Sequence, residues 1–361
     1  MLMRKQSLYF ILFMSIFTIL ALFFILTIGQ DSLDGKNSFQ FYSDSNTYIQ
    51  AYKEAATGLD SSLVTVNNNF LGPLTILWLL QGNSYLVILL NVYIFTHSII
   101  FITGKLNINP LEVGLLLLMS PIAISSLLSV NKEIIIFPFL AFGLCAYMRK
   151  SIFFTLIALI LSIMVRWQLT IYYLLILLLS FNQRLVRFKS RVTVLITLLL
   201  GISITYMIIQ PLIEPVIAYA NLSFENYEGD GSGLFELMLS FQNKGYYIFA
   251  FPIKAFHLLF GLGFKIDKIF SPQDIYNDIF IGLHCAVAFI VFILLFKRRL
   301  FTIQNDLIYA SIIFLTIFCV TPMFTPRYLF FVFILWVLVL AGAPNALTRL
   351  KKNNQFKHDT M

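Results

Sequence analysis

The sequence predicts an all-α polytopic membrane protein with about ten transmembrane helices. Of its 361 residues 59% are apolar and only 12% are charged, whereas soluble domains are about a quarter charged. Mean hydropathy is +0.86. The apolar residues form long unbroken runs, while a membrane β-barrel would show short alternating segments. The runs predict helices at 8–29, 84–103, 111–129, 134–148, 151–165, 169–181, 192–211, 279–296, 307–322 and 328–343.

The first run follows a basic start, Arg4 and Lys5, and extends over 8–29. The apolar region of a signal peptide has about 7–15 residues. The longer run here can cross a bilayer core of about 30 Å, so we expect a retained first helix. The runs between 134 and 181 are short for a full crossing. They are expected to extend into their flanks or to line a thinner, hydrated part of the protein.

The charges predict the orientation. Alternating the ten helices places sixteen of the 25 Lys and Arg residues on one side, with only three of the 17 Asp and Glu residues. Because positive residues stay in the cytoplasm during insertion, that side is predicted to be cytoplasmic, with both termini and a basic tail at 344–361. The clusters "RLVRFKSR" and "KRR" therefore indicate topology in the bacterial inner membrane, and no nucleic-acid partner is expected.

The whole chain, 1–361, is predicted to form one integral membrane unit. Two outward, periplasmic segments are expected at about 30–69 and 213–278, and both are expected to carry amphipathic helices. The apolar stretch 245–264 is interrupted by Pro252 and Lys254. It is expected to lie on or dip into the outer leaflet, as are residues 70–81, which are too few to cross.

Cysteine and histidine give no sign of a metal or disulfide site. Cys145, Cys285 and Cys319 lie in apolar runs without paired spacing, and the four His residues are scattered. We predict that the cysteines are small core residues and expect neither a bound metal nor a cofactor.

The stretch "FYSDSNTYIQAYKEA" (41–55) is the first long polar run. Ser43 or Asp44 can cap a helix, because a short side-chain oxygen accepts from the free N–H groups of the first turn. On that helix Asp44, Tyr48 and Tyr52 share one face. The stretch is therefore either an ordinary capped interfacial helix, or an amphipathic helix that holds an acid at the mouth of a membrane cavity.

Three junctions between apolar runs place bases on the outward side, against the charge rule. They are "SVNKEIII" with Lys132 and Glu133, "IMVRWQLT" with Arg166 and Trp167, and "MFTPRYLFF" with Arg327. Charges close to the membrane are costly and tend to be functional. In the purely structural alternative, Lys132 pairs with Glu133 and the arginines snorkel to headgroups.

Outward arginines suit a phosphorylated lipid, because the guanidinium fork binds phosphate oxygens in pairs. A nearby acid suits deprotonation of an acceptor hydroxyl. Together they predict glycosyl transfer from a lipid-linked donor, with the arginines stabilising the charge on the leaving phosphate. Tyr48 and Trp167 can pack on sugar faces, although both are equally expected in the aromatic belt of a membrane protein.

The order "SDSNTYIQAY", "FLGPLTILWLL", "SPIAISSLLSVNKEIII", "RWQ", "TPRYLFF" resembles the polytopic glycosyltransferases of the C-type fold, and among them bacterial O-antigen or capsule repeat-unit polymerases. The resemblance implies that Asp44, in the first outward loop, is the catalytic base. It also implies that Arg166 and Arg327 hold undecaprenyl pyrophosphate, with Lys132 as a weaker match. Ser45 follows Asp44 where that fold class commonly has a second acid, which leaves the base and a metal requirement open.

From this resemblance the candidate site residues are Asp44 and Glu133 as catalytic acids and Tyr48, Lys132, Arg166, Trp167 and Arg327 as substrate-binding residues. The expected partners are an undecaprenyl-pyrophosphate-linked glycan and membrane lipids, and a chain-length regulator is a further candidate. Three alternatives stay open: a transferase that uses a polyprenyl-phosphate sugar, a flippase or transporter of lipid-linked oligosaccharides, and a non-catalytic scaffold.

Overall fold

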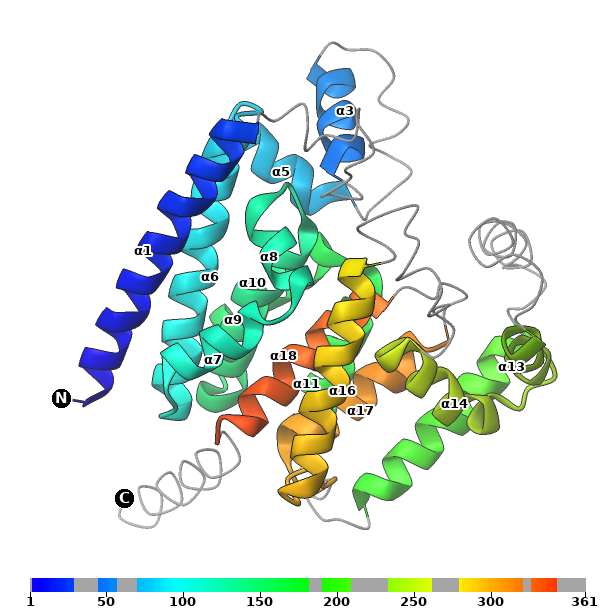
Figure 1. Ribbon diagram of the computed structural model, residues 1–361. Coiled ribbons are helices and arrows are strands. Elements are labelled where there is room, and N and C mark those ends of the chain that lie inside the picture. Colours follow the sequence, from blue (N-terminus) through cyan, green and yellow to red (C-terminus); the bar gives the residue numbers. More distant parts are fainter. Residues whose placement is uncertain are drawn as a thin grey trace.

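The computed structural model describes residues 2–28, 45–56, 70–181, 190–208, 233–261, 279–320 and 326–342. Every regular element in these ranges is helical (Figure 1). The α-helices and the two short 3-10 helices are α1 (Leu2–Ile28), α3 (Ser45–Ala56), α5 (Leu71–Leu79), α6 (Ser84–Leu106), α7 (Pro110–Leu118), α8 (Pro121–Leu128), η2 (Lys132–Ile135), α9 (Ile136–Arg149), α10 (Ile152–Val165), α11 (Trp167–Phe181), an unlabelled helix Ser190–Ile208, α13 (Gly233–Asn243), α14 (Tyr247–Phe260), α16 (Ile281–Lys297), α17 (Asp306–Phe318), η5 (Pro326–Leu329) and α18 (Phe330–Leu340).

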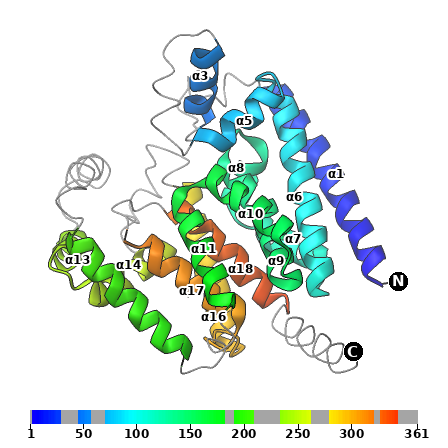
Figure 2. The same cartoon turned by 180° about the vertical axis from the view of Figure 1, so that it is seen from behind.

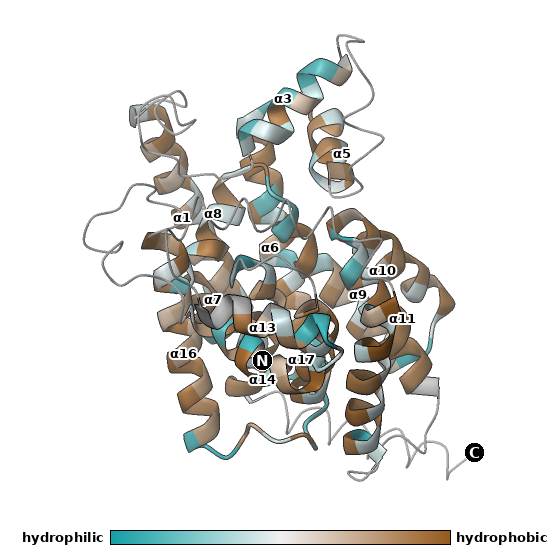
Figure 3. Cartoon of the chain, turned by 90° about the vertical axis from the view of Figure 1, so that its right-hand side faces the viewer, coloured by the Kyte–Doolittle hydropathy of each residue, from teal (hydrophilic) through white to brown (hydrophobic). Residues whose placement is uncertain are grey.

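Three helices in the described ranges are long and apolar enough to cross a membrane: Arg4–Thr27, Ser84–Leu106 and Ser190–Ile208. They coincide with three of the predicted spans. Many of their large apolar side chains are exposed, among them Leu12 and Phe23 of α1. Apolar residues dominate most helices, whereas α3 is strongly polar (Figure 3). These features indicate an α-helical membrane protein, because lipid solvates an apolar exterior.

The run 111–129 was expected to be one span, and the structure divides it. The helices α7 and α8 are bent by 93° at the short break between them. Pro121 occupies the first turn of α8, and the preceding residue Ser120 is extended, with φ −83° and ψ 119°. A proline there starts a helix readily but cannot continue the one before it, because it has no N–H to donate. The pair forms a broken span or a re-entrant loop.

The remaining predicted spans are helical but short. α9, α10 and α16 contain 14, 14 and 17 residues, so at 1.5 Å per residue the longest of them extends about 25 Å. The structure therefore does not reproduce ten full-length crossings in the residues described. The stretch 245–264 was expected to lie on or dip into the outer leaflet. In the structure Lys254 of α14 is fully buried within the protein.

Helix α18 occupies the centre of the bundle. All eleven of its residues are buried, and it packs against α7, α16 and α17. A helix that is apolar on every side is one that protein surrounds completely. Its Trp336 ring packs against Phe292 and Phe301, and the indole Nε1 donates to Ser311 Oγ at 3.1 Å.

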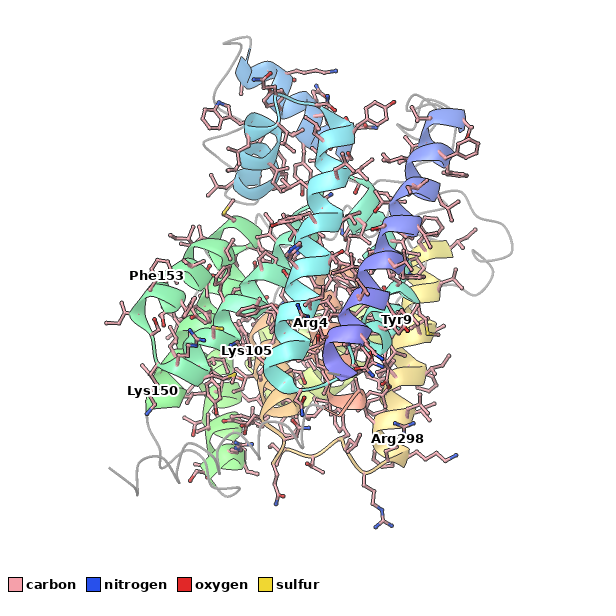
Figure 4. The ribbon with its side chains drawn as sticks, turned by 90° about the vertical axis from the view of Figure 1, so that its left-hand side faces the viewer. Arg4, Tyr9, Lys105, Lys150, Phe153 and Arg298 are labelled. Atoms are coloured by element: carbon pink, nitrogen blue, oxygen red, sulfur yellow. The ribbon has the colours of Figure 1, made fainter. Side chains whose placement is uncertain are left out.

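The two ends of the bundle differ. Helices α3 and α5 lie at the end opposite the beginning of α1 (Figures 1 and 2). Arg4, Lys105, Lys150 and Arg298 lie toward the end where α1 begins (Figure 4). Arg191, at the start of the helix Ser190–Ile208, donates to Oδ1 of Asp306, the first residue of α17, at 2.5 Å. The chain therefore gathers many of its bases at one end of the bundle.

Candidate functional site

Two breaks between helices position the charged residues of the predicted junctions. Asn131 caps η2, and its side-chain oxygen accepts from Glu133 N at 3.2 Å. Arg166 is extended, with φ −176° and ψ 149°, and separates α10 from α11. Its carbonyl oxygen accepts from Leu169 N at 3.0 Å and so starts α11. Because α10 packs against η2, the two breaks lie side by side.

Glu133 and Arg166 form a buried ion pair across these breaks. Arg166 Nη2 donates to Glu133 Oε1 at 2.8 Å, and their side chains are 6% and 2% exposed, respectively. Glu133 Oε2 has no hydrogen-bond partner among the residues that the structure describes. The structural alternative from the sequence is therefore wrong in two respects: Glu133 pairs with Arg166 from another helix, and Arg166 does not snorkel outward.

Tyr328 connects Arg166 to the third junction. The Arg166 Cζ atom lies 4.4 Å from the centre of the Tyr328 ring, and the Arg327 Cζ atom lies 5.2 Å from the same centre. The two guanidinium carbons are therefore no more than 9.6 Å apart. Both distances suit cation–π attraction, which strengthens where water is excluded. Residues 161 positions apart in the chain are thus brought to one site, which we call the arginine cluster: Lys132, Glu133, Arg166, Arg327 and Tyr328.

Asn91 supports the arginine cluster from α6. Its Nδ2 lies within hydrogen-bond distance of three backbone oxygens at the end of α8, the shortest being Ser129 O at 2.7 Å. Asn91 is fully buried. The last carbonyls of a helix have no partner within the helix, so this amide satisfies groups that would be costly to bury. Sequence reasoning missed Asn91, although an amide between the apolar stretches 85–90 and 92–95 was a visible signal.

Helices α3 and α5 pack on the same end. Gly72 of α5 approaches α10 so closely that an added Cβ would lie 2.5 Å from the carbonyl oxygen of Met164. Tyr48 of α3 is only 1% exposed, and its ring meets the Phe70 ring edge-on at 5.2 Å. Asp44, the predicted base, lies outside the described residues. In the chain it directly precedes Ser45, the first residue of α3.

The other predicted site residues differ in exposure. Lys132 is buried, whereas Trp167 is 50% exposed beside the buried Arg166. Trp78, on α5, is also exposed. The three cysteines are buried free thiols, as predicted from their apolar surroundings. A search of the described ranges finds no group of three or more His, Cys, Asp or Glu residues able to hold a metal ion.

Comparison with known proteins gives no family assignment. No protein-family model, no curated protein and no solved structure matches the chain. The function must therefore be argued from the geometry of the arginine cluster and from the membrane setting.

Proposed function

We propose that the chain is a membrane glycosyltransferase that polymerises undecaprenyl-pyrophosphate-linked repeat units of O-antigen or capsule on the periplasmic face of the bacterial inner membrane. The observation that carries the proposal is the arginine cluster, in which two guanidinium groups lie close to one tyrosine ring and whose elements η2 and α10 pack against α5. This placement agrees with the resemblance of the sequence to such polymerases.

The arginines of the cluster favour an anionic ligand. Lys132, Glu133 and Arg166 are all buried, where charges interact more strongly than in water. Guanidinium groups bind phosphate oxygens in pairs, so a pyrophosphate would suit the neighbouring Arg166 and Arg327.

The surroundings of the cluster suit a lipid-linked substrate. Apolar side chains of α10 and α11 next to Arg166 are exposed, including Ile163, Trp167 and Ile171. Lipid chains would contact this surface in the membrane. An undecaprenyl tail can therefore remain in the bilayer while its pyrophosphate reaches the arginines.

In the proposed reaction the acceptor sugar hydroxyl loses its proton to a carboxylate and its oxygen attacks the anomeric carbon of the donor glycan. The bond from that carbon to the pyrophosphate oxygen breaks, and the electron pair leaves with the pyrophosphate. Arg166 and Arg327 stabilise the developing charge. Asp44 is the proposed base. Glu133, the second candidate acid, holds Arg166 in position through its ion pair, and its buried Oε2 accepts no hydrogen bond from the described residues.

The alternatives share parts of this geometry. A transferase that uses a polyprenyl-phosphate sugar would bind a single phosphate at the same arginines. A flippase or transporter is favoured by one observation, the broken pair α7–α8, because transporters place substrate sites at interrupted helices. At that break Ser120 Oγ and His284 Nδ1 lie 2.8 Å apart, both buried. A chain-length regulator remains a proposed partner, and the bundle end with α3 and α5 would be the side it meets.

The test is the lipopolysaccharide or capsule banding pattern of a deletion strain complemented with variants at matched expression. Wild type should restore a ladder, whereas Arg166→Ala and Arg327→Ala should leave core plus one repeat unit. Arg298→Ala is the matched control, because Arg298 is an exposed arginine at the opposite end. Loss of every band above the core in the deletion strain would favour transport instead, and an unchanged ladder would refute the proposal.

A further inference from the structure

A buried polar pair joins α13 to α14, away from the arginine cluster. Lys254 Nζ donates to Gln242 Oε1 at 2.8 Å, and neither residue is exposed to solvent. Gln242 Nε2 donates in turn to Val320 O, also at 2.8 Å. We call this arrangement the Gln242 clamp. The sequence marked Lys254 only as an interruption in an apolar stretch, because its partner lies twelve residues earlier, on another helix.

The clamp requires an amide at position 242. The carbonyl oxygen of Gln242 accepts from an ammonium group while its NH₂ group donates to a backbone carbonyl. Among side chains of this length only glutamine performs both roles, since glutamate accepts but does not donate when ionised. The pair Gln242 and Lys254 is therefore specific in chemistry and not only in size.

The clamp holds the turn that directly follows α17. The helix ends at Phe318, and its last carbonyls have no partners within the helix. Gln242 satisfies Val320 O, and the Tyr247 hydroxyl donates to Thr316 O at 2.7 Å. An ammonium group near a helix C-terminus also opposes the partial negative charge there. Helices α13 and α14 thus fix the last turn of α17 from one side.

Phe318, the last residue of α17, contacts the arginine cluster. The Phe318 ring packs against the Tyr328 ring at 5.8 Å, and the Arg166 Cζ atom lies 5.8 Å from the Phe318 ring centre. Helix α14 also packs directly on η5, which carries Arg327. A displacement at Val320 would therefore reach the tyrosine that both arginines flank.

We infer that Gln242 and Lys254 are positioning residues that fix the end of α17 and, through Phe318 and Tyr328, the spacing of Arg166 and Arg327. Neither residue touches the proposed ligand. The consequence for activity depends on the proposed function, because a pyrophosphate is bound well only if the two guanidinium groups keep their separation.

Three variants separate the parts of the clamp. Gln242→Glu keeps the acceptor for Lys254 and loses the donor to Val320 O, Gln242→Leu loses both, and Lys254→Met removes the ammonium at nearly constant shape. Ser311→Ala is the control, since it removes a buried hydrogen bond from Trp336 in the middle of α17. All four are compared with wild type as full-length protein in lipid nanodiscs.

The first measurement is amide hydrogen exchange. In all three clamp variants, exchange should rise about tenfold in peptides from 310–320 and 326–335, the effect of losing about 1.4 kcal/mol of local stability, while peptides from α6 stay unchanged. Ser311→Ala should leave 326–335 at the wild-type rate. Unchanged exchange in the Gln242→Glu variant would overturn the inference, because that variant keeps an acceptor for Lys254 but replaces the donor to Val320 O with a carboxylate that repels it.

The second measurement separates this inference from the proposed function. With an undecaprenyl-pyrophosphate oligosaccharide as donor, the clamp variants should raise KM about tenfold and change kcat less, whereas Ser311→Ala should leave KM unaltered. If kcat falls and KM rises by the same factors in Ser311→Ala as in the clamp variants, the cause is general destabilisation, and the positioning role is overturned. Raised exchange together with a wild-type protein that neither binds nor uses the donor would refute the proposed function alone.

Discussion

Replacing Glu133 by glutamine removes the carboxylate from a pair whose two side chains are 2% and 6% exposed. The Arg166 guanidinium is then buried without its counter-charge, and breaking one partner of a buried pair costs about 3–5 kcal/mol. Arg166→Gln likewise leaves the Glu133 carboxylate buried without a counter-charge. It also loses the contact with the Tyr328 ring, which adds about 1–2 kcal/mol to the cost.

The double variant Glu133→Gln/Arg166→Gln carries neither charge, so its cost should be smaller than the two single costs combined. We expect a coupling energy of about 2 kcal/mol or more from the double-mutant cycle. Free energies of unfolding can be measured by denaturant titration in detergent micelles with a thiol-reactive dye. No cysteine has to be introduced for this measurement. Cys145, Cys285 and Cys319 are buried free thiols, so we expect them to react with the dye only when the protein unfolds.

A second pair provides the comparison. Arg191 and Asp306 are 7% and 18% exposed in their side chains, and Arg191 also donates to Ile303 O and Gln304 O. Partial solvation and these extra acceptors should lower the coupling in the cycle Arg191→Gln/Asp306→Asn. If the Glu133 and Arg166 variants each cost under about 1 kcal/mol and their costs add, the argument from buried charge is refuted.

Two further predictions concern helix packing. Gly114→Ala should destabilise the protein by about 1–3 kcal/mol, because the added Cβ would lie 2.1 Å from Phe10 Cε2. The loss can be measured with the same thiol-reactive dye. If adding Phe10→Leu to this variant does not recover part of the lost stability, the explanation is contradicted. Asn91→Leu should cost about 1–3 kcal/mol by leaving the carbonyl oxygens at the end of α8 unsatisfied. Raised hydrogen exchange confined to 125–133 would support that explanation, and an exchange rate equal to wild type there would oppose it.

Much of the helical framework was predictable from composition alone. The long apolar runs at α1, α6 and 190–208 reappear as helices, because a backbone in lipid must satisfy its own hydrogen bonds. The direction change at Ser120 was not predicted, although Pro121 was visible in the run 111–129. Hydropathy averages over such a break, since most flanking side chains are apolar, and so a bent pair and a straight helix have similar profiles.

The candidate site was predicted in part. The three junctions that were predicted to face outward contain residues that the structure brings together at Arg166 and Tyr328. The structural alternative paired Glu133 with its sequence neighbour Lys132, whereas in the structure Glu133 pairs with Arg166, 33 positions away. Gln242 was missed for the same reason: nothing local in the chain shows that its amide meets both Lys254 and Val320. Local patterns reveal which groups are costly to bury, and only the tertiary packing shows which groups satisfy them.

The enclosed position of α18 has a consequence for biogenesis. At eleven residues it extends only about 17 Å, too short to span a bilayer core of about 30 Å, and no side of it faces lipid. The helices around it, α7, α16 and α17, all precede it in the chain. During synthesis these helices leave the ribosome first. The space between them that α18 later fills must therefore stay empty, or be filled by lipid, until residue 340 has emerged. Closure of the bundle is thereby tied to completion of this segment, and a nascent chain arrested before Phe330 would expose an apolar hollow to the insertion machinery and to membrane proteases.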